Sequence, residues 1–273
     1  MTRTERSRKR TAKTRSSRLA DVLPSSCHRR VVFSRVFDIL RLPTCSSSAL
    51  TRRDLRHPDL PATTTIAITF VAVASLAWHG RVPGIERRLT GALVQGPGSM
   101  AFEVGDVVSV LGSRGLVTVV ALVLAANVWR RSGDAMLAAT VPVAAAIGGI
   151  AELVAKHVVE RFRPPTAVYT GEVGFGFPSG HTTGFVAVAI SALAVLSARP
   201  TISRRAVGFA VVGALAAAVG LGRILVGADY VLDVGAGMLL GVLCARAAIV
   251  LVVLIDQVVA NRRKSRATPS GPA

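Results

Sequence analysis

The sequence has few acidic residues, few aromatic residues and no cysteine framework. Asp and Glu account for 15 of its 273 residues, against 33 Lys and Arg, and aromatic residues make up 5%. The three cysteines, Cys27, Cys45 and Cys244, lack metal-ligand spacing, and their odd number gives no disulfide framework. The sequence therefore indicates neither a cysteine-bound metal site nor a disulfide-stabilised domain.

Hydrophobic residues are abundant and occur in long blocks. They make up 51% of the chain, and the mean hydropathy of +0.52 is too high for an ordinary soluble domain. Residues 1–60 hold 15 Lys or Arg and 5 Asp or Glu, so 15 − 5 = +10 of the net charge of +18 lies there. This distribution argues against nucleic-acid binding. It predicts that residues 1–59 form a disordered, Arg-rich cytoplasmic tail.

The hydrophobic blocks predict an all-α integral membrane protein with a six-helix transmembrane bundle. A bilayer crossing needs about 20 mostly apolar residues. We expect the bundle to span residues 60–256, followed by a basic cytoplasmic C-terminal tail at 257–273. The six expected spans are 60–80, 107–129, 135–156, 180–198, 206–222 and 231–255.

The loop charges predict the orientation of this bundle. Cytoplasmic loops of membrane proteins carry an excess of Lys and Arg. The basic segments 129–134, 198–205 and 261–266 are therefore expected inside. Both termini would then be cytoplasmic, with the protein in the plasma membrane. Segments 81–106, 157–179 and 223–230 would lie on the extracytoplasmic face.

Three distant segments with chemically useful side chains fall on that face. Lys and Arg side chains could hold an oxyanion there, because one arginine can bind two oxygens of the same anion through two of its N–H groups. Ser179 and Gly180 open a helix, whose free N–H groups attract an anion, and His181 could donate a proton. The three groups are Lys156 with Arg163, Ser179 with Gly180 and His181, and Arg223 with Asp229 and Asp233.

These segments resemble the three-part signature of the type 2 phosphatidic acid phosphatase family, which includes the vanadium haloperoxidases. The matching parts are "KHVVERFRP" (156–164), "PSGH" (178–181), and Arg223 with Asp233. The resemblance implies a membrane hydrolase that removes phosphate from a lipid phosphate or diphosphate on the extracytoplasmic face. It implies no cofactor, no metal and no nucleic-acid partner, and the sequence makes no prediction of oligomeric state.

The resemblance also implies roles for individual residues. Phosphate would be held by the cations together with the start of the fourth span. His181 would protonate the leaving group, and Asp233 would orient the nucleophile. The implied phosphate-binding residues are Lys156, Arg163, Ser179, Gly180 and Arg223.

The third part departs from the family pattern at two positions. The family usually has Ser-Arg, then His and Asp, but here Gly222 replaces the serine and Asp229 replaces the nucleophilic histidine. Asp229 could itself be the nucleophile and form an acyl-phosphate. The site could instead bind lipid phosphate without turnover, in a catalytically inactive or regulatory protein. His157 as a substitute base, and a transporter or structural role, are weaker alternatives.

Other charged residues near the third span have simpler interpretations. Glu152 stands four residues before Lys156, an order that favours an ion pair on one helical face. We expect that pair to be partly buried. Glu160 and Arg161 lie in the following loop and are expected to be solvated, with Arg161 able to contact a lipid headgroup.

Overall fold

The computed structural model describes residues 59–78, 83–196 and 202–267, which form eight α-helices and no extended strand beyond one isolated β-bridge, Phe162–Phe175. The all-α prediction is confirmed for these residues, whereas the predicted tail lies outside them apart from Asp59. In chain order the elements are α3 (Asp59–Ala77), α4 (Gly84–Leu93), α5 (Met100–Ser109), the 3-10 turn η2 (Val110–Gly112), α6 (Arg114–Ser132), α7 (Ala135–Val159), the 3-10 turn η3 (Pro165–Thr170), α8 (Gly180–Leu196), α9 (Ile202–Leu225) and α10 (Val231–Ala267).

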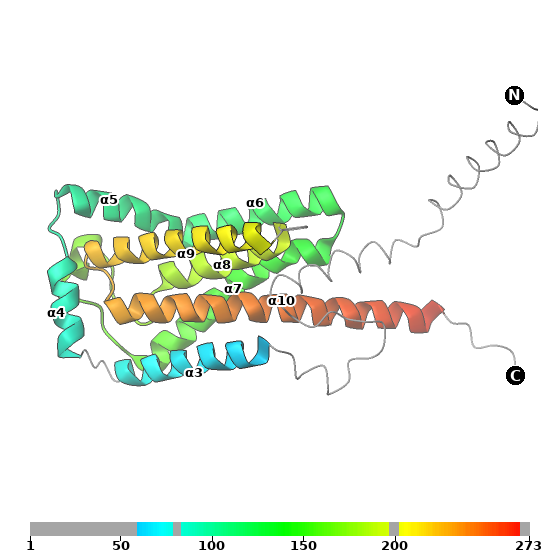
Figure 1. Cartoon of the computed structure of the whole chain (residues 1–273), viewed down its shortest axis with the longest axis horizontal. Helices are drawn as coiled ribbons and strands as arrows, with labels where there is room; N and C mark the ends of the chain where they lie inside the picture. The colour runs from blue at the N-terminus through cyan, green and yellow to red at the C-terminus, as the bar shows by residue number, and fades with distance from the viewer. Residues whose placement is uncertain (1–58, 79–82, 197–201, 268–273) are drawn as a thin grey trace, which may run out of the picture.

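The long helices lie side by side along the long axis of the molecule, and α4 crosses one end of the bundle (Figure 1). In the described residues, α3, α6, α7, α9 and α10 are long and apolar enough to cross a membrane. Helix α8 is also apolar but has 17 residues, which at 1.5 Å per residue is short of a 30 Å hydrocarbon core. These helices make the chain an integral membrane protein. The number of six spans remains a prediction.

The second span starts later than the hydropathy pattern predicts. Its helix, α6, begins at Arg114 because the side chain of Ser113 caps it, accepting a hydrogen bond from the Leu116 N–H at 3.4 Å. Residues 107–112 belong to α5 and η2 instead. The segment between the first two spans thus contains two helices that hydropathy alone does not predict.

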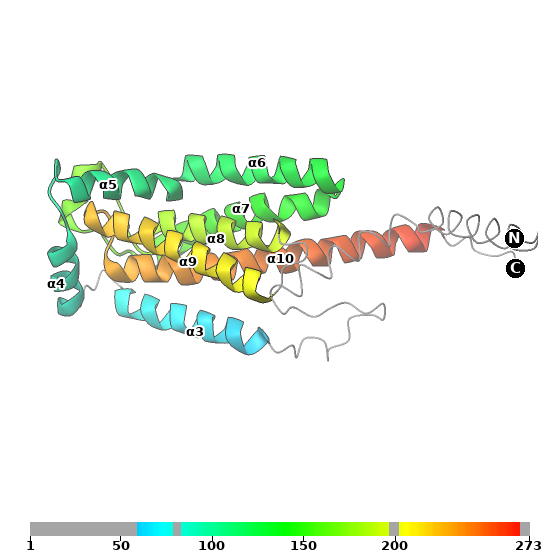
Figure 2. The ribbon, with the colours of Figure 1, turned by 45° about the horizontal axis from the view of Figure 1, so that its top comes forward.

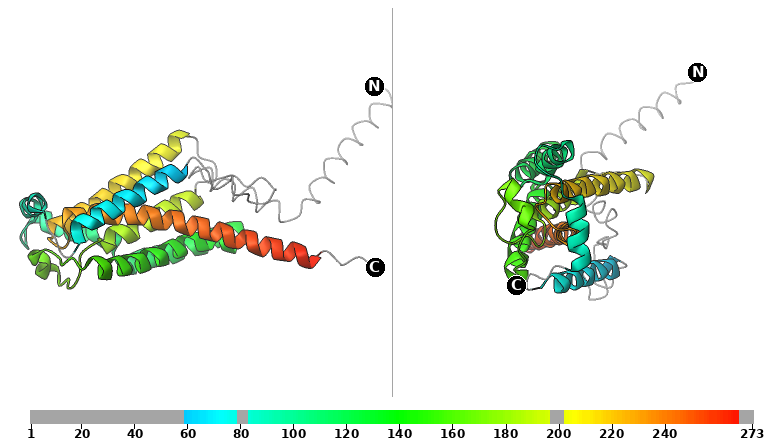
Figure 3. Two further views of the ribbon diagram at one scale, coloured as in Figure 1. Left: turned by 90° about the horizontal axis from the view of Figure 1, so that it is seen from below. Right: turned by 90° about the vertical axis from the view of Figure 1, so that its left-hand side faces the viewer.

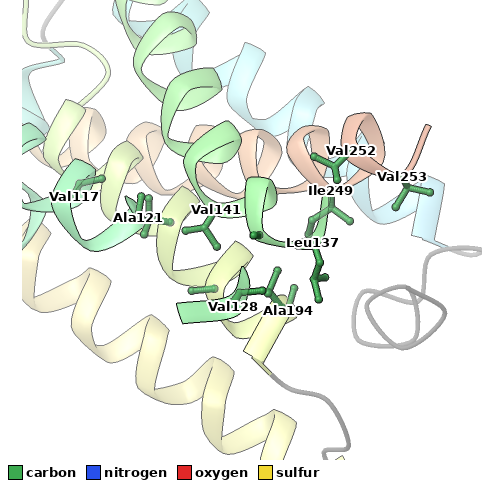
Figure 4. Close-up of a cluster of buried hydrophobic side chains, with 13 residues drawn as sticks. Val117, Ala121, Val128, Leu137, Val141, Ala194, Ile249, Val252 and Val253 are labelled. Carbon is green, nitrogen blue, oxygen red and sulfur yellow. The ribbon is translucent and has the colours of Figure 1, made fainter. Parts of the chain in front are cut away.

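The core of the bundle lies between α6, α7, α8 and α10. Figure 4 shows Val117 and Ala121 of α6, Val141 of α7 and Ile249 of α10 pointing into one buried cluster. These side chains are small or β-branched, so the helices approach closely. Large apolar side chains on the other faces, such as Ile150, are exposed, as expected where a helix faces lipid tails.

One end of the bundle collects the polar segments. Helices α7 and α9 end there, and α8 and α10 begin there (Figures 1 and 2). Figure 3 looks onto this end in its right-hand view, with α4 crossing in front of the other helices. Because consecutive long helices alternate in direction, the start of α3 and the end of α10 lie at the opposite end.

Candidate active site

A buried carboxylate, that of Asp229, is the centre of the polar cluster at this end. It lies in the turn between α9 and α10, where Gly227 has a positive φ of 69°. The hydroxyl of Ser179, just before α8, donates to one Asp229 oxygen at 2.7 Å. Arg223 Nε donates to the same oxygen at 3.1 Å, and Arg163 Nη1 donates to the other oxygen. Three predicted site residues from three segments thus meet at Asp229.

A second carboxylate, that of Glu172, joins the same two arginines from outside. Its two oxygens lie 3.0 Å from Arg163 Nη2 and 3.0 Å from Arg223 Nη2. Each guanidinium group therefore bridges Asp229 and Glu172, with one nitrogen directed at each carboxylate. Glu172 has no counterpart among the predicted site residues.

The arginines stabilise both carboxylates as anions. Burial alone raises the pKa of the Asp229 carboxyl group, but Arg223, Arg163 and the Ser179 hydroxyl outweigh burial and hold that pKa below its usual value. Burial likewise opposes ionisation of Glu172, and Arg223 and then Arg163 lower its pKa below the usual value. Both side chains are therefore negatively charged at neutral pH.

The loop that carries Arg163 and Glu172 is closed at its base. The Gly176 N–H donates to the Arg161 carbonyl at 2.8 Å, beside the bridge between Phe162 and Phe175. The Thr166 hydroxyl donates to the Gly227 carbonyl at 2.9 Å and so ties the loop to the turn that holds Asp229. The local backbone thereby sets Arg163 and Arg223 on either side of one carboxylate.

Lys156 forms a neighbouring cluster instead of joining the two arginines. Its Nζ lies 2.6 Å from Glu152 Oε1, which also accepts a hydrogen bond from Arg114 at 2.8 Å. The predicted pair of Glu152 and Lys156 is therefore present. The Glu152 carboxylate lies so close to Gly180 that a side chain at that position would collide with it. Lys156 and Gly180 are thus brought together, with Glu152 between them.

His181 is the second residue of α8, directly after Ser179 and Gly180. His181 is half-buried, its backbone lies against Gly112 of η2, and it is near enough to Arg223, Asp229 and Glu172 to feel their charges. The other histidine near the signature, His157, is exposed on α7, and its Nδ1 pairs with the Leu153 carbonyl at 2.8 Å. Its surroundings give no support to a role as substitute base.

Asp233 belongs to a separate buried network, and here one prediction is wrong. Arg161 is fully buried rather than solvated, because Nη1 donates to Asp233 at 2.9 Å and Nη2 donates to Glu86 of α4. Its guanidinium also stacks 4.6 Å from the centre of the Tyr230 ring. Two carboxylates and an aromatic face compensate this charge for its loss of water.

This network fixes the start of α10. Asp233 Oδ2 accepts from the Tyr230 N–H at 2.9 Å, and Glu86 accepts from the Leu232 N–H at 2.9 Å. Tyr230 directly follows Asp229, so Asp233 acts on the backbone that carries the Asp229 side chain. Direct orientation of Asp229 by Asp233 remains a prediction.

The sequence-based interpretation missed four charged residues near the site: Glu86, Arg114, Arg161 and Glu172. Their signal in the sequence was weak, because each lies in a loop or at a helix end where charge is ordinary. Only the tertiary contacts distinguish them. In the described residues, no group of three or more His, Cys, Asp or Glu side chains is arranged to hold a metal ion, and the site carboxylates pair with cations.

Comparison with known proteins agrees with this arrangement. The family model of the PAP2 superfamily matches residues 137–255, a range that contains every predicted site residue. The chain also resembles the crystal structure of a transmembrane PAP2-type phosphatidylglycerolphosphate phosphatase from Bacillus subtilis. That match has a TM-score of 0.61 and 23% identity, and it covers 71% of this chain and 96% of the other. No curated protein sequence matches.

These two findings identify the class of protein: an integral membrane protein with a PAP2-type fold. The predicted resemblance to the type 2 phosphatidic acid phosphatase family is confirmed by the match of residues 137–255 to the PAP2 superfamily.

Proposed function

We propose that this chain is a membrane-embedded hydrolase that removes phosphate from a lipid phosphate or diphosphate at the extracytoplasmic face. The observation that carries the proposal is the convergence of Arg163 and Arg223 on one buried spot beside Ser179. Two guanidinium groups with paired donors suit the oxygens of a phosphoryl group. Arg163 Nε is also buried without a hydrogen-bond partner, so a phosphate oxygen could satisfy it.

The chemistry would begin at Asp229. One carboxylate oxygen would bond to the terminal phosphorus while its bond to the leaving oxygen breaks, which is the lipid oxygen in a monophosphate and the bridging oxygen in a diphosphate. His181 would give that leaving oxygen a proton. Water would then attack phosphorus in the acyl-phosphate and pass a proton to His181, while the bond between phosphorus and the Asp229 oxygen breaks. Inorganic phosphate leaves, and both side chains return to their starting states. The arginines would stabilise the charge that develops on the phosphoryl oxygens.

The helices of membrane-spanning length around the site support a lipid as the carrier of the phosphate. The candidates are polyprenyl diphosphates, phosphatidic acid and phosphatidylglycerol phosphate. The similarity to the phosphatidylglycerolphosphate phosphatase supports the last of these, although fold similarity does not by itself select a substrate. The basic segments 129–134 and 261–266, at the end opposite Asp229, support an extracytoplasmic site.

One observation favours a second candidate, a catalytically inactive protein that binds lipid phosphate. Asp229 is held by three donors, and its lowered pKa makes it a weakly basic carboxylate. Such a carboxylate is a poorer nucleophile than a free one. A site of this kind could recognise phosphate without cleaving it.

Phosphate release from a panel of lipid phosphates separates the two candidates. We expect the purified parent to turn over at least one substrate and Asp229→Asn to lose roughly a thousandfold or more in rate, since the amide cannot form the acyl-phosphate. Asp229→His tests whether the remaining residues accept the usual nucleophile of the family. Exposed Asp106 supplies the control, because Asp106→Asn should keep full activity.

Each outcome bears on one candidate. Turnover by the parent, with loss of turnover in Asp229→Asn, supports Asp229 as the nucleophile. Unchanged turnover in Asp229→Asn contradicts it. Lipid phosphate bound but never cleaved by the parent would support the binding protein instead.

A further inference from the structure

Glu172 occupies the outer half of the arginine pair. Its two oxygens reach Arg163 and Arg223 at 3.0 Å each, so one carboxylate bridges both cations. A phosphoryl group bound by the same two arginines would need these donors. The chain thus supplies its own anion at the place where the proposed substrate should bind.

Glu172 is the most exposed member of this group. Its side chain is 28% exposed, against 9% for Arg163, 4% for Arg223 and 2% for Asp229. Asp229 closes the inner side of the arginine pair and Glu172 closes the outer side. An anion that arrives from the aqueous phase therefore meets Glu172 first.

The backbone around Glu172 permits a change of position. Gly171 precedes it with φ of 69°, and Gly174 follows two residues later with φ of 84°. Neither glycine has a neighbouring atom in the space where a side chain would begin. A cavity of about 280 Å³ opens beside Arg163 and Glu172, which leaves room for an incoming group or for the displaced side chain.

The charge of Glu172 makes it a competitor for any anion that binds the two arginines. The two arginines, Arg163 and Arg223, are matched by two carboxylates of the chain, Asp229 and Glu172. A tethered carboxylate has a high effective concentration at its partner, so a free anion of similar strength does not replace it. Only an anion that binds both arginines more tightly can do so.

We propose that Glu172 is an internal competitor that a phosphate group must displace from Arg163 and Arg223 before it can bind. The proposal rests on the proposed function, because it assumes that these arginines are the phosphate site. Glu172 then sets the minimum affinity for occupancy. It keeps the site closed to weakly bound anions, including the phosphodiester groups of ordinary membrane lipids.

Two small probes test this inference on the full-length protein in a maltoside detergent, which carries no phosphate. Methyl phosphate is a dianion at pH 8, since its second pKa is about 6, and dimethyl phosphate is a monoanion. Calorimetric titration gives the Kd of each probe for the parent and for Glu172→Gln, Glu172→Ala and Glu160→Gln. Glu160 is exposed in the same loop and serves as the matched control.

We expect both Glu172 variants to bind each probe about tenfold more tightly than the parent, because the competing charge-assisted hydrogen bonds are gone. The gain should be the same for both probes, since a displaced carboxylate costs each probe the same free energy. Glu160→Gln should match the parent. Hydrogen exchange in residues 165–176 of the parent should increase when methyl phosphate binds.

Three results would overturn the proposal. Equal affinities in the parent and both Glu172 variants would show that Glu172 does not compete. A gain for methyl phosphate much larger than that for dimethyl phosphate would show that Glu172 stays beside the bound anion and repels it. Weaker binding in both variants would make Glu172 part of the binding site.

Arg223→Ala separates this proposal from the proposed function. If methyl phosphate binds to the parent and this binding is lost in Arg223→Ala, the arginines form the phosphate site, and this conclusion does not depend on the results for Glu172. If Arg223→Ala binds like the parent, or no variant binds either probe, the phosphate site itself is contradicted and the Glu172 proposal with it.

Discussion

At the scale of single residues, an aspartate at position 229 changes the charge of the site. A carboxylate brings a buried negative charge to a position where the related family usually has a histidine ring. The structure compensates this charge with Ser179, Arg163 and Arg223. The same contacts that make Asp229 tolerable also reduce its basicity. Whether it reacts therefore depends on how far a bound phosphate draws the arginines away.

The lowered pKa of Asp229 predicts acid sensitivity. Because its pKa in the folded protein lies below that of the unfolded chain, the unfolded chain binds more protons as the pH falls below about 4. The contribution of Asp229 to the free energy of unfolding should therefore decrease with falling pH in this window and stay constant near neutrality. Asp229→Asn should make the decrease shallower.

The thermal unfolding midpoint in detergent, followed from pH 7 to pH 3, measures this effect. Asp106→Asn, at an exposed position of α5, should leave the acid slope of the parent unchanged. An equally steep slope in Asp229→Asn and the parent would contradict the interpretation.

At the scale of helices, α5 and α9 touch through their backbones. A side chain begun at Gly222 would lie 2.5 Å from the Gly105 carbonyl oxygen, and one begun at Gly105 would lie 3.2 Å from the Gly222 carbonyl oxygen. Two glycines facing each other thus allow a close crossing, as small residues often do between membrane helices. This contact explains the departure at Gly222, because the family's usual serine does not fit against α5.

Gly222→Ser should destabilise the protein by about 1–3 kcal/mol, since the added atoms force α5 and α9 apart. Gly213→Ser, nine residues earlier on α9, is the matched control, because open space surrounds Gly213. The thermal unfolding midpoint in detergent should fall in the first variant and stay near the parent value in the second. Equal midpoints for Gly222→Ser and the parent would show that the helices adapt without cost.

At the scale of the whole molecule, the alternating helix directions place different charged groups at the two ends of the bundle. The polar clusters gather where α8 and α10 begin, and the α6–α7 turn lies at the other end with Arg130 and Arg131. Helix α4 crosses the site end, with Ile85, Leu89 and Leu93 exposed at a spacing of four. Its buried Glu86 connects it to Arg161 and the start of α10.

The proposed orientation predicts which end a reagent outside the cell can reach. In a chain with its three cysteines replaced by alanine, Val173→Cys introduces a thiol in the exposed loop at the site end, and Ser132→Cys introduces one at the α6–α7 turn. A membrane-impermeant maleimide should label Val173→Cys in intact cells and Ser132→Cys only after permeabilisation. The reverse pattern would invert the topology.

The sequence by itself predicted the helical class, the resemblance to the PAP2 superfamily and the candidate phosphate-binding residues. Apolar blocks of bilayer length leave few alternatives to membrane helices, because unpaired backbone groups are too costly in lipid. The spacing of Lys156 and Arg163, with "PSGH" at 178–181, was specific enough to predict the resemblance that the PAP2 superfamily match over residues 137–255 confirms. The i, i+4 pairing of Glu152 with Lys156 followed from helix geometry.

Only the tertiary structure decided which charges meet. The partners of Arg161 stand 75 and 72 residues away, at Glu86 and Asp233, and Glu172 lies 51 residues from Arg223. No local pattern encodes such pairs, since they depend on how helices cross and where a loop closes. A surface charge and a buried one look alike in sequence. In the part of this chain that the structure describes, an arginine is buried only where folding brings carboxylates from distant segments within about 3 Å of it.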